Sequence, residues 1–166
     1  ICTRACKFCA VKTGKPLPPN LDEPREVAKS ILKLNLKHVV LTSVDRDDLD
    51  DLGAGLWAET VRQIKELNPD TTIETLIPDF QGKTELIQKV IDAHPDVISH
   101  NLETVKRLSP KIRSRAEYMT SLRLIKQISE SGIMSKSGIM AGLGESFDEV
   151  VELMDDLRSA DCKVFT

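Results

Sequence analysis

Apolar residues follow two spacings that alternate along the chain. Short runs rich in β-branched residues are typical of strands buried on both faces of a parallel sheet. Between them, apolar residues recur every three or four positions, as they do on one face of a helix. The pattern predicts strands at residues 37–42, 72–77, 96–100 and 133–140, a fifth strand that starts near residue 163, and helices over residues 22–34, 57–64, 86–91, 118–128 and 147–157.

This alternation predicts an α/β fold with a parallel sheet and right-handed crossovers. From the residues alone, the sheet is either a barrel or an open doubly wound sheet. Both architectures place their sites at the carboxyl ends of the strands, so chemistry is expected in the residues just after each strand. Two details are also predicted: Asp22 caps the first helix, and Phe147 and Met154 lie on the apolar face of the last one.

The composition is that of a single domain without a strongly charged partner. The 166 residues suffice for a substantial core, and the net charge of -3 comes from mixed acidic and basic residues. There is no basic footprint for nucleic acid, no polybasic membrane patch, and no apolar run near the roughly 20 residues of a membrane helix. One close group of three cysteines and the distant Cys162 make a disulfide framework unexpected, which favours a reducing compartment such as the cytoplasm.

Three cysteines at the start of the chain carry the strongest chemical signal. Cys2, Cys6 and Cys9 have the spacing C-x3-C-x2-C, which suits three thiolate ligands of a 4Fe-4S cluster. The fourth iron then keeps an open position for a substrate or cofactor, as catalytic metal sites do. A structural zinc site is the alternative, but it needs a fourth ligand, and the remaining cysteine, Cys162, is near the other end of the chain.

Polar residues follow two of the predicted strands. Thr42, Ser43 and Asp45 come after the strand at 37–42 and could hold an ammonium or sulfonium group, although a solvated turn is the simpler alternative. Asn101 and Glu103 come after the strand at 96–100 and could bind the vicinal hydroxyls of a ribose. They could equally form a helix cap and an acidic first turn.

The segment 136–145 is rich in glycine but matches neither the dinucleotide nor the phosphate-loop motif, so it favours a nucleotide without a pyrophosphate clamp. Lys136 could bind a carboxylate there, or extend its ammonium from a barrel rim into water. Elsewhere, Arg113, Arg115 and Arg123 form a local positive cluster. This cluster could contact an acidic or acyl-carrier partner, or it is a solvated face.

Five motifs follow one another across the chain: Cys-Thr-Arg-Ala-Cys-Lys-Phe-Cys, Thr-Ser-Val-Asp-Arg-Asp-Asp-Leu, Ile-Pro-Asp-Phe-Gln-Gly, His-Asn-Leu-Glu-Thr-Val and Lys-Ser-Gly-Ile-Met-Ala-Gly-Leu-Gly-Glu. In type and order they resemble the lipoyl synthase family of the radical S-adenosylmethionine superfamily. The stretches 42–49 and 100–105 resemble this family more than biotin synthase or other relatives. At Ala10 the chain departs from the family, which commonly has Asp or Asn after the third cysteine.

The resemblance implies a partial, TIM-barrel-like (β/α) barrel of the radical SAM type, in which the three cysteines hold a 4Fe-4S cluster. The open iron would chelate S-adenosylmethionine, and an electron from a donor such as flavodoxin or ferredoxin would release a 5'-deoxyadenosyl radical. This radical would abstract hydrogens from an octanoyl chain on a lipoyl domain or a glycine-cleavage H-type carrier protein. Sulfur would then be inserted at C6 and C8, in the cytoplasm or in a mitochondrion or plastid of a eukaryotic host.

The same resemblance implies a role for each cofactor-binding residue. Cys2, Cys6 and Cys9 would be the cluster ligands. The other expected positions are Phe8 beside the cluster, Thr42, Ser43 and Asp45 at the methionyl end of the cofactor, Asn101 and Glu103 at its ribose, and Lys136 with the backbone from Gly138 to Met140 near its carboxylate or adenine. No residue is assigned a catalytic role of its own.

The chain begins at Ile1 inside the cysteine motif, so we expect residues 1–166 to be a fragment: a radical SAM core domain without its flanking segments. In the family, those segments ligate an auxiliary 4Fe-4S cluster that donates sulfur. We therefore expect this second cluster only in the intact parent protein. Two alternatives remain open: another radical SAM reaction of the biotin-synthase or methylthiolating type, and a metal-stabilised binding module without catalysis.

Overall fold

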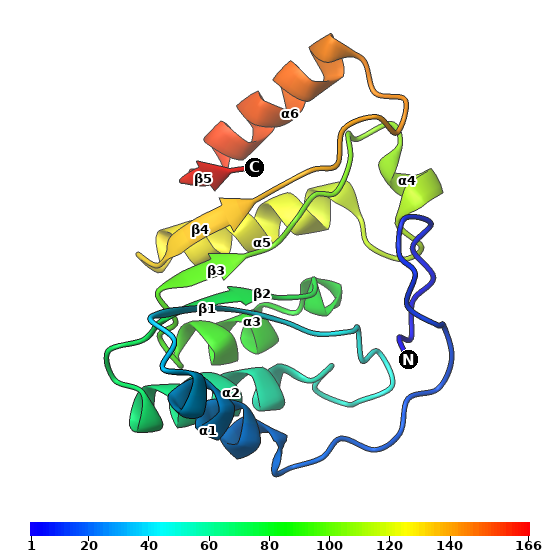
Figure 1. Cartoon of the computed structure of the whole chain (residues 1–166). Helices are drawn as coiled ribbons and strands as arrows, with labels where there is room; N and C mark the ends of the chain where they lie inside the picture. Colours follow the sequence, from blue (N-terminus) through cyan, green and yellow to red (C-terminus); the bar gives the residue numbers. More distant parts are fainter.

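The structure is a computed structural model that describes all residues, Ile1 to Thr166. Its centre is a sheet of five parallel strands flanked by helices (Figure 1). The elements are α1 (Glu23–Leu34), β1 (His38–Thr42), α2 (Ala54–Leu67), β2 (Thr72–Leu76), η1 (Phe80–Gly82), α3 (Thr84–Ile91), β3 (Val97–Ser99), α4 (Ser109–Ile112), α5 (Tyr118–Glu130), β4 (Met134–Ser137), α6 (Phe147–Ser159) and β5 (Val164–Phe165).

The strand order decides between the two α/β architectures. The strands lie side by side in the order β1-β2-β3-β4-β5, which is also their order along the chain. Since each crossover then steps to the next strand with the same hand, the long helices form one layer, in which α1 packs on α2, α2 on α3, α3 on α5 and α5 on α6. A doubly wound sheet would instead reverse its strand order and carry helices on both faces. The fold is therefore a parallel α/β sheet of the partial-barrel kind, which confirms the predicted fold class.

Three local predictions are wrong. Asp22 precedes α1, but its side chain makes no capping hydrogen bond, and the helix start relies on the proline in its first turn. Phe147 and Met154 are exposed on α6, because the buried face of that helix runs through Leu153 and Leu157. The strand predicted at 133–140 ends at Ser137, and the chain beyond it makes only an isolated bridge.

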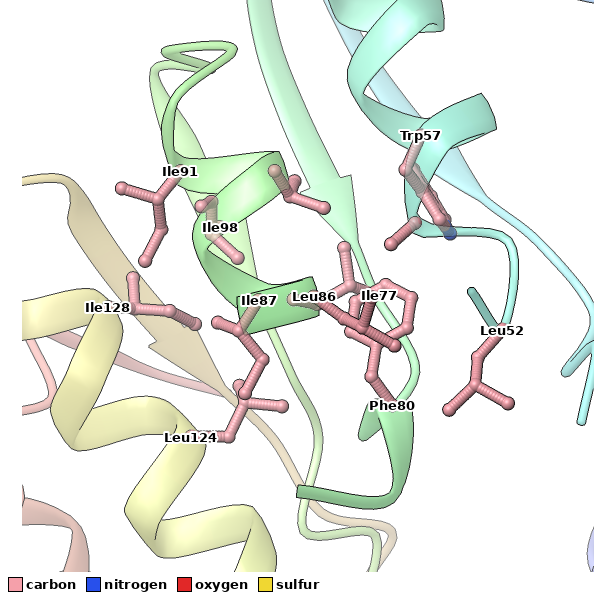
Figure 2. Close-up of a cluster of buried hydrophobic side chains, with 12 residues drawn as sticks. Leu52, Trp57, Ile77, Phe80, Leu86, Ile87, Ile91, Ile98, Leu124 and Ile128 are labelled. Carbon is pink, nitrogen blue, oxygen red and sulfur yellow. The ribbon is translucent and has the colours of Figure 1, made fainter. Parts of the chain in front are cut away.

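The largest core cluster lies between the sheet and helices α2, α3 and α5 (Figure 2). Trp57 on α2 belongs to this cluster and is buried. Ile98 from β3 is fully buried against α3 and α5. Alternate residues of the same strands face the other side of the sheet, where Glu74, Ser99 and Lys136 are hydrogen-bonded to one another. The helices therefore pack on the apolar face of the sheet, and the opposite face carries polar side chains that can take part in chemistry.

Replacing Ile98 by valine is expected to lower the free energy of unfolding by about 0.5–1.5 kcal/mol, because it removes one methylene from a packed core. The matched change Val40→Ala, on an edge strand where Val40 is 56% exposed, is expected to stay within about 0.5 kcal/mol. Urea denaturation of both variants measures the difference. Equal losses would contradict the assignment of Ile98 to the central core.

The cysteine loop lies at the edge of the sheet where the strand arrows end (Figure 1). It is tied to that edge by two backbone hydrogen bonds, from Thr3 N to Asp45 O at 3.2 Å and from Lys7 N to Ile112 O at 2.9 Å. The N-terminal motif and the polar strand ends are therefore brought together, as the sequence predicted. No helix has both the length and the apolar character needed to cross a membrane.

Candidate cluster and nucleotide site

A cavity of about 250 Å³ opens at this carboxyl edge. Most of the predicted site residues line it, namely Cys2, Cys6, Phe8, Cys9, Thr42, Ser43, Asp45, Asn101 and Glu103. They come from the cysteine loop and from the carboxyl ends of β1 and β3, so the strand ends bring these residues together as expected. A larger open groove of about 790 Å³ lies between α1 and β1, but none of the predicted site residues lines it.

The cysteine thiols surround the cavity at different depths. Cys2 is buried, Cys6 is half-buried and Cys9 is exposed. The Cys2 thiol donates to Asp45 Oδ2 at 3.7 Å, and Cys6 Sγ lies 3.9 Å from Ser114 Oγ. No three of the His, Cys, Asp and Glu side chains gather closely enough to hold a single metal ion.

This donor set fits three ligands of an iron-sulfur cube better than a zinc tetrahedron. The three groups around the cavity are all thiols, the ligands that iron-sulfur clusters take. Neither a histidine nor a fourth thiol is at hand to complete a structural zinc site, because both ring nitrogens of His100 are engaged by Ile77 O and Ser121 Oγ, and Cys162 lies near Ser135 at the start of β4, the opposite edge of the sheet.

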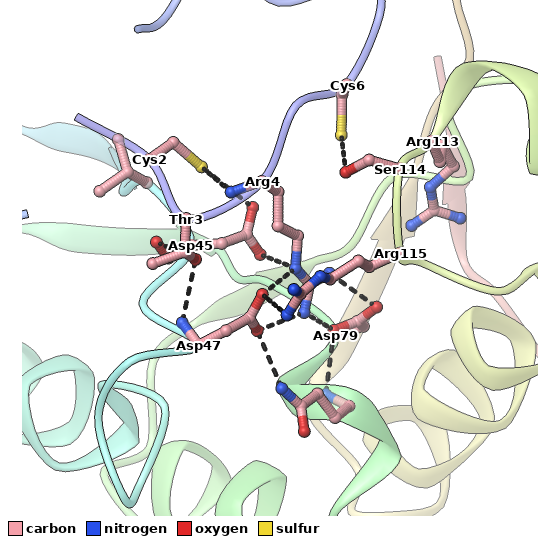
Figure 3. A network of polar contacts seen from close by, with 12 residues as sticks. Cys2, Thr3, Arg4, Cys6, Asp45, Asp47, Asp79, Arg113, Ser114 and Arg115 are labelled. Atoms are coloured by element: carbon pink, nitrogen blue, oxygen red, sulfur yellow. Dashed lines mark hydrogen bonds and ion pairs between the residues drawn. The ribbon is translucent and has the colours of Figure 1, made fainter. Parts of the chain in front are cut away.

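Arg4, between the first two cysteines, is a site residue that the sequence analysis missed. Its buried guanidinium makes two bidentate ion pairs: Nε and Nη2 donate to Asp47 at 2.8 Å each, and Nη1 and Nη2 donate to Asp79 at 3.0 and 2.7 Å (Figure 3). Burial alone would lower the pKa of Arg4, but these hydrogen bonds outweigh it and raise the pKa. The same bonds hold the pKa of Asp47 below its usual range.

Asp45 lies between this ion-pair network and the cavity. One of its oxygens is 3.3 Å from Arg4 Nε, and the other accepts from the Cys2 thiol. Burial raises the pKa of Asp45, and the neighbouring charges of Asp79 and Asp47 act in the same direction against the opposing charge of Arg4. A carboxylate in this position is suited to a cationic ligand group, because such a group would relieve the excess of negative charge.

Glu103 is held in a strained backbone conformation, with φ of 64°. Its amide donates to Gly138 O at 3.1 Å, and its carbonyl accepts from Met140 N at 2.9 Å. Gly138 also allows the close approach of Asn101, since a Cβ there would lie 3.2 Å from Asn101 Oδ1 and 3.0 Å from Thr166 O. Gly138 and Met140 thus shape the position of Glu103 without lining the cavity, and their contact with adenine stays a prediction.

Lys136 does not line the cavity either. Its ammonium donates to both oxygens of Glu74, at 2.9 and 3.1 Å, on the polar face of the sheet. Glu74 also accepts from Ser99 Oγ at 2.6 Å. Because this pair satisfies Lys136 within the chain, a contact with the cofactor carboxylate stays a prediction.

Arg113 is the second residue that the sequence analysis misplaced. It does not belong to a surface cluster with Arg115 and Arg123, because it is 6% exposed and its side chain lines the cavity, whereas the other two are exposed. Its nitrogens contact Ser121 Oγ at 3.0 Å and His100 Nε2 at 3.5 Å, and it forms no ion pair. Burial lowers the pKa of Arg113. Because no carboxylate forms an ion pair with it, Arg113 lines the cavity as a buried cation without such a partner.

His100 helps to hold Arg113 through a shared hydrogen-bond partner, Ser121. Its Nδ1 lies 2.9 Å from Ile77 O, so Nδ1 carries the proton and donates. Its Nε2 then accepts from the Ser121 hydroxyl at 2.8 Å, and Ser121 Oγ accepts in turn from Arg113. Burial lowers the pKa of His100 to about 4, with the Arg113 charge acting in the same direction, so the ring is neutral at pH 7.

Comparison with known proteins shows the superfamily of the chain. The chain matches the radical SAM superfamily over residues 1–157, and it belongs to that superfamily. It is 64% identical over 166 residues to the lipoyl synthase of Phocaeicola vulgatus, covering all of this chain and 58% of that protein. It is 52% identical over 167 residues to the mitochondrial lipoyl synthase of Nematostella vectensis, covering all of this chain and 57% of that protein.

A solved structure supports the fold. Methylornithine synthase superposes with a TM-score of 0.79 at 16% sequence identity, covering 99% of this chain and 49% of that one. At such low identity the likeness concerns the fold alone. The chain therefore spans somewhat more than half the length of the curated relatives and about half of methylornithine synthase.

Proposed function

We propose that this chain is the catalytic core of a lipoyl synthase. The observation that carries the proposal is one cavity lined by three cysteines together with polar residues from the ends of β1, β2 and β3. Cys2, Cys6 and Cys9 would ligate a 4Fe-4S cluster, with S-adenosylmethionine in the adjoining space. When bound, the cluster supplies the electron that cleaves the cofactor, while the protein positions and shields the reactants.

The carboxylate, the cationic groups and the ribose of the cofactor would each have a suitable partner in the cavity. The carboxylate of S-adenosylmethionine would pair with Arg113, the buried cation that has no carboxylate of its own. The ammonium and sulfonium charges would face Asp45, and the ribose hydroxyls would be bound by Asn101 and Glu103. The strained backbone of Glu103 holds that carboxylate at the rim before the nucleotide arrives.

The chain covers 58% and 57% of the relatives named lipoyl synthase, and we propose the whole reaction only for the intact protein. The substrate would be an octanoyl chain on a lipoyl domain or an H-type carrier protein, and the reductant a protein such as flavodoxin or ferredoxin. An auxiliary 4Fe-4S cluster would belong to the intact protein. Free thiols in the cluster site require a reducing compartment: the cytoplasm, or a mitochondrion or plastid of a eukaryotic host.

The experiment that tests the function is anaerobic reconstitution with iron and sulfide, followed by reduction in the presence of S-adenosylmethionine. The expected result is a brown protein with one cluster from these residues and formation of 5'-deoxyadenosine. Zinc uptake without a cluster would contradict the proposal and favour a binding module. A cluster without any 5'-deoxyadenosine would also contradict it.

Replacing Arg113 by glutamine is expected to raise the Kd for S-adenosylmethionine by about 10- to 100-fold, since a hydrogen bond to a charged group contributes about 1.5–3 kcal/mol. The matched control is Arg123→Gln, which removes an exposed arginine that donates to Thr120 outside the cavity. Equilibrium dialysis with the oxidised, cluster-loaded protein measures both. Equal affinities in the two variants would rule out Arg113 as the carboxylate partner.

A further inference from the structure

Arg4 makes the most extensive side-chain connection between the cysteine loop and the sheet. Arg4 lies between Cys2 and Cys6, and its guanidinium binds Asp47 from the loop after β1 and Asp79 from the loop after β2 (Figure 3). Both carboxylates are nearly inaccessible, with side chains 5% and 3% exposed. Two strand ends of the sheet thus hold the same guanidinium, two residues from the first thiol and two from the second.

The main chain of Arg4 extends this connection to the thiol itself. Arg4 N donates to Cys2 Sγ at 3.4 Å, and Arg4 O accepts from Thr13 Oγ1 at 3.0 Å. The outer part of the loop is exposed at Lys7, Phe8 and Cys9, and the backbone bond from Lys7 N to Ile112 O connects it to α4 rather than to the strand ends that hold Arg4. The place of the Cys2 sulfur relative to the cavity therefore depends on where Arg4 is held.

The geometry requires an arginine rather than a positive charge alone. Four short hydrogen bonds to two carboxylates use the planar fork of the guanidinium, which a single ammonium cannot reproduce. Asp79 is held in turn by a bond from Gln81 N at 2.9 Å, so the carboxylate cannot simply follow a shorter or differently shaped partner. Loss of the arginine would leave Asp47 and Asp79 as buried like charges beside the thiols.

We infer that Arg4 is a positioning residue for the cysteine trio: through its two bidentate pairs it sets the place of the thiols against the nucleotide cavity. The inference deepens the proposed function and rests on it for the identity of the bound group. It predicts that a lysine at this position preserves the charge and the fold but places the thiols incorrectly. Arg107→Lys is the matched control, because Arg107 also pairs with a carboxylate through two nitrogens but is exposed and lies outside the cavity.

The first measurement needs no cluster. In the metal-free full chain, the rate of Cys2 alkylation, followed by mass spectrometry, is expected to rise about tenfold in Arg4→Lys, because the buried thiol is released. Alkylation of the distant Cys162 is expected to stay unchanged in the same sample, which separates local release from unfolding. An unchanged Cys2 rate in a folded variant would overturn the inference even if the wild-type protein binds a cluster and cleaves S-adenosylmethionine.

The second measurement tests the functional consequence. After reconstitution, Arg4→Lys is expected to contain iron within about twofold of the wild type. Its Kd for S-adenosylmethionine, from the change in the electron paramagnetic resonance spectrum of the reduced cluster, is expected to rise about tenfold, the range found when groups that orient metal ligands are changed. Arg107→Lys should match the wild type. An unchanged Kd in Arg4→Lys would also overturn the inference, because a merely structural loss would lower iron content without shifting affinity.

If Arg4→Lys does not fold, a milder variant still tests the inference. Asp79→Asn keeps Arg4 and its pair with Asp47 but weakens the second pair. Cys2 alkylation is expected to rise about threefold, with Cys162 again unchanged. Equal Cys2 rates in Asp79→Asn and wild type would contradict the inference. A wild-type protein that binds no cluster would instead refute the proposed function, while the alkylation result would still test the role of Arg4.

Discussion

Replacing Cys6 by alanine is expected to abolish formation of 5'-deoxyadenosine, by at least about 1,000-fold, which corresponds to about 4 kcal/mol. The reason is that an iron that loses its thiolate no longer belongs to a stable cube, so the open position next to the cavity is lost with it. Cys6 is the best of the three for this test. Its sulfur is half-buried and has only a long contact with Ser114, at 3.9 Å, so its removal costs the apo fold little.

The control for this experiment is Cys162→Ala. That thiol is also half-buried, but it lies at the opposite edge of the sheet, where it donates to Val164 O at 3.3 Å. Iron content, brown absorbance and product formation are expected to match those of the wild type. If Cys6→Ala retained both iron and activity, or if both variants lost them equally, the assignment of the cluster to the N-terminal trio would be wrong.

The site could be predicted where it follows from local sequence and from a general property of parallel sheets. Thr42, Asp45, Asn101 and Glu103 were identified because they follow predicted strands, and the carboxyl ends of parallel strands meet at one edge. The cysteine spacing needed no tertiary information. The choice between a barrel and a doubly wound sheet did need it, because both give the same alternation along the chain and differ only in strand order.

The buried arginines of the site could not be predicted, for a different reason. Arginine and aspartate are normally exposed, so Arg113 was placed in a local positive cluster, and Arg4 and Asp47 were given no role in the site. Their burial depends on partners that are distant in the sequence, such as Asp79, which is 75 residues from Arg4. The error on α6 is similar, because Phe147 continues an apolar spacing but is 81% exposed, and only the packing shows which face the helix buries.

The protonation of His100 also depends on residues that are distant in the sequence. Its pKa of about 4 lies below the ordinary value of 6.5, because the ring is fully buried and close to Arg113. The unfolded chain therefore binds a proton more readily than the folded one between these two values. The stability that comes from a neutral His100 is fully present above about pH 6.5 and is lost as the pH falls toward 4.

Protonation would also reverse the hydrogen bonds that hold Arg113. With a proton on Nε2, the His100 ring can no longer accept from Ser121, so the hydroxyl must turn its hydrogen away from both the ring and the Arg113 guanidinium, which are then both donors. Two cations would then face each other across one hydroxyl in a buried space. The protonation of His100 thus affects the fold and the cation that lines the cavity together.

Replacing His100 by glutamine, which does not titrate, is expected to remove this pH dependence. Relative to pH 7.5, the wild-type chain should lose more stability than His100→Gln by about 1 kcal/mol at pH 5.5 and about 2–3 kcal/mol at pH 4.5, as linkage gives for a pKa of about 4 against 6.5. Urea denaturation of the metal-free proteins measures it, and the difference between the two cancels the titration of the carboxylates. Parallel stability curves from pH 7.5 to 4.5 would show that His100 is not a buried neutral ring, and Arg113 would then need another support.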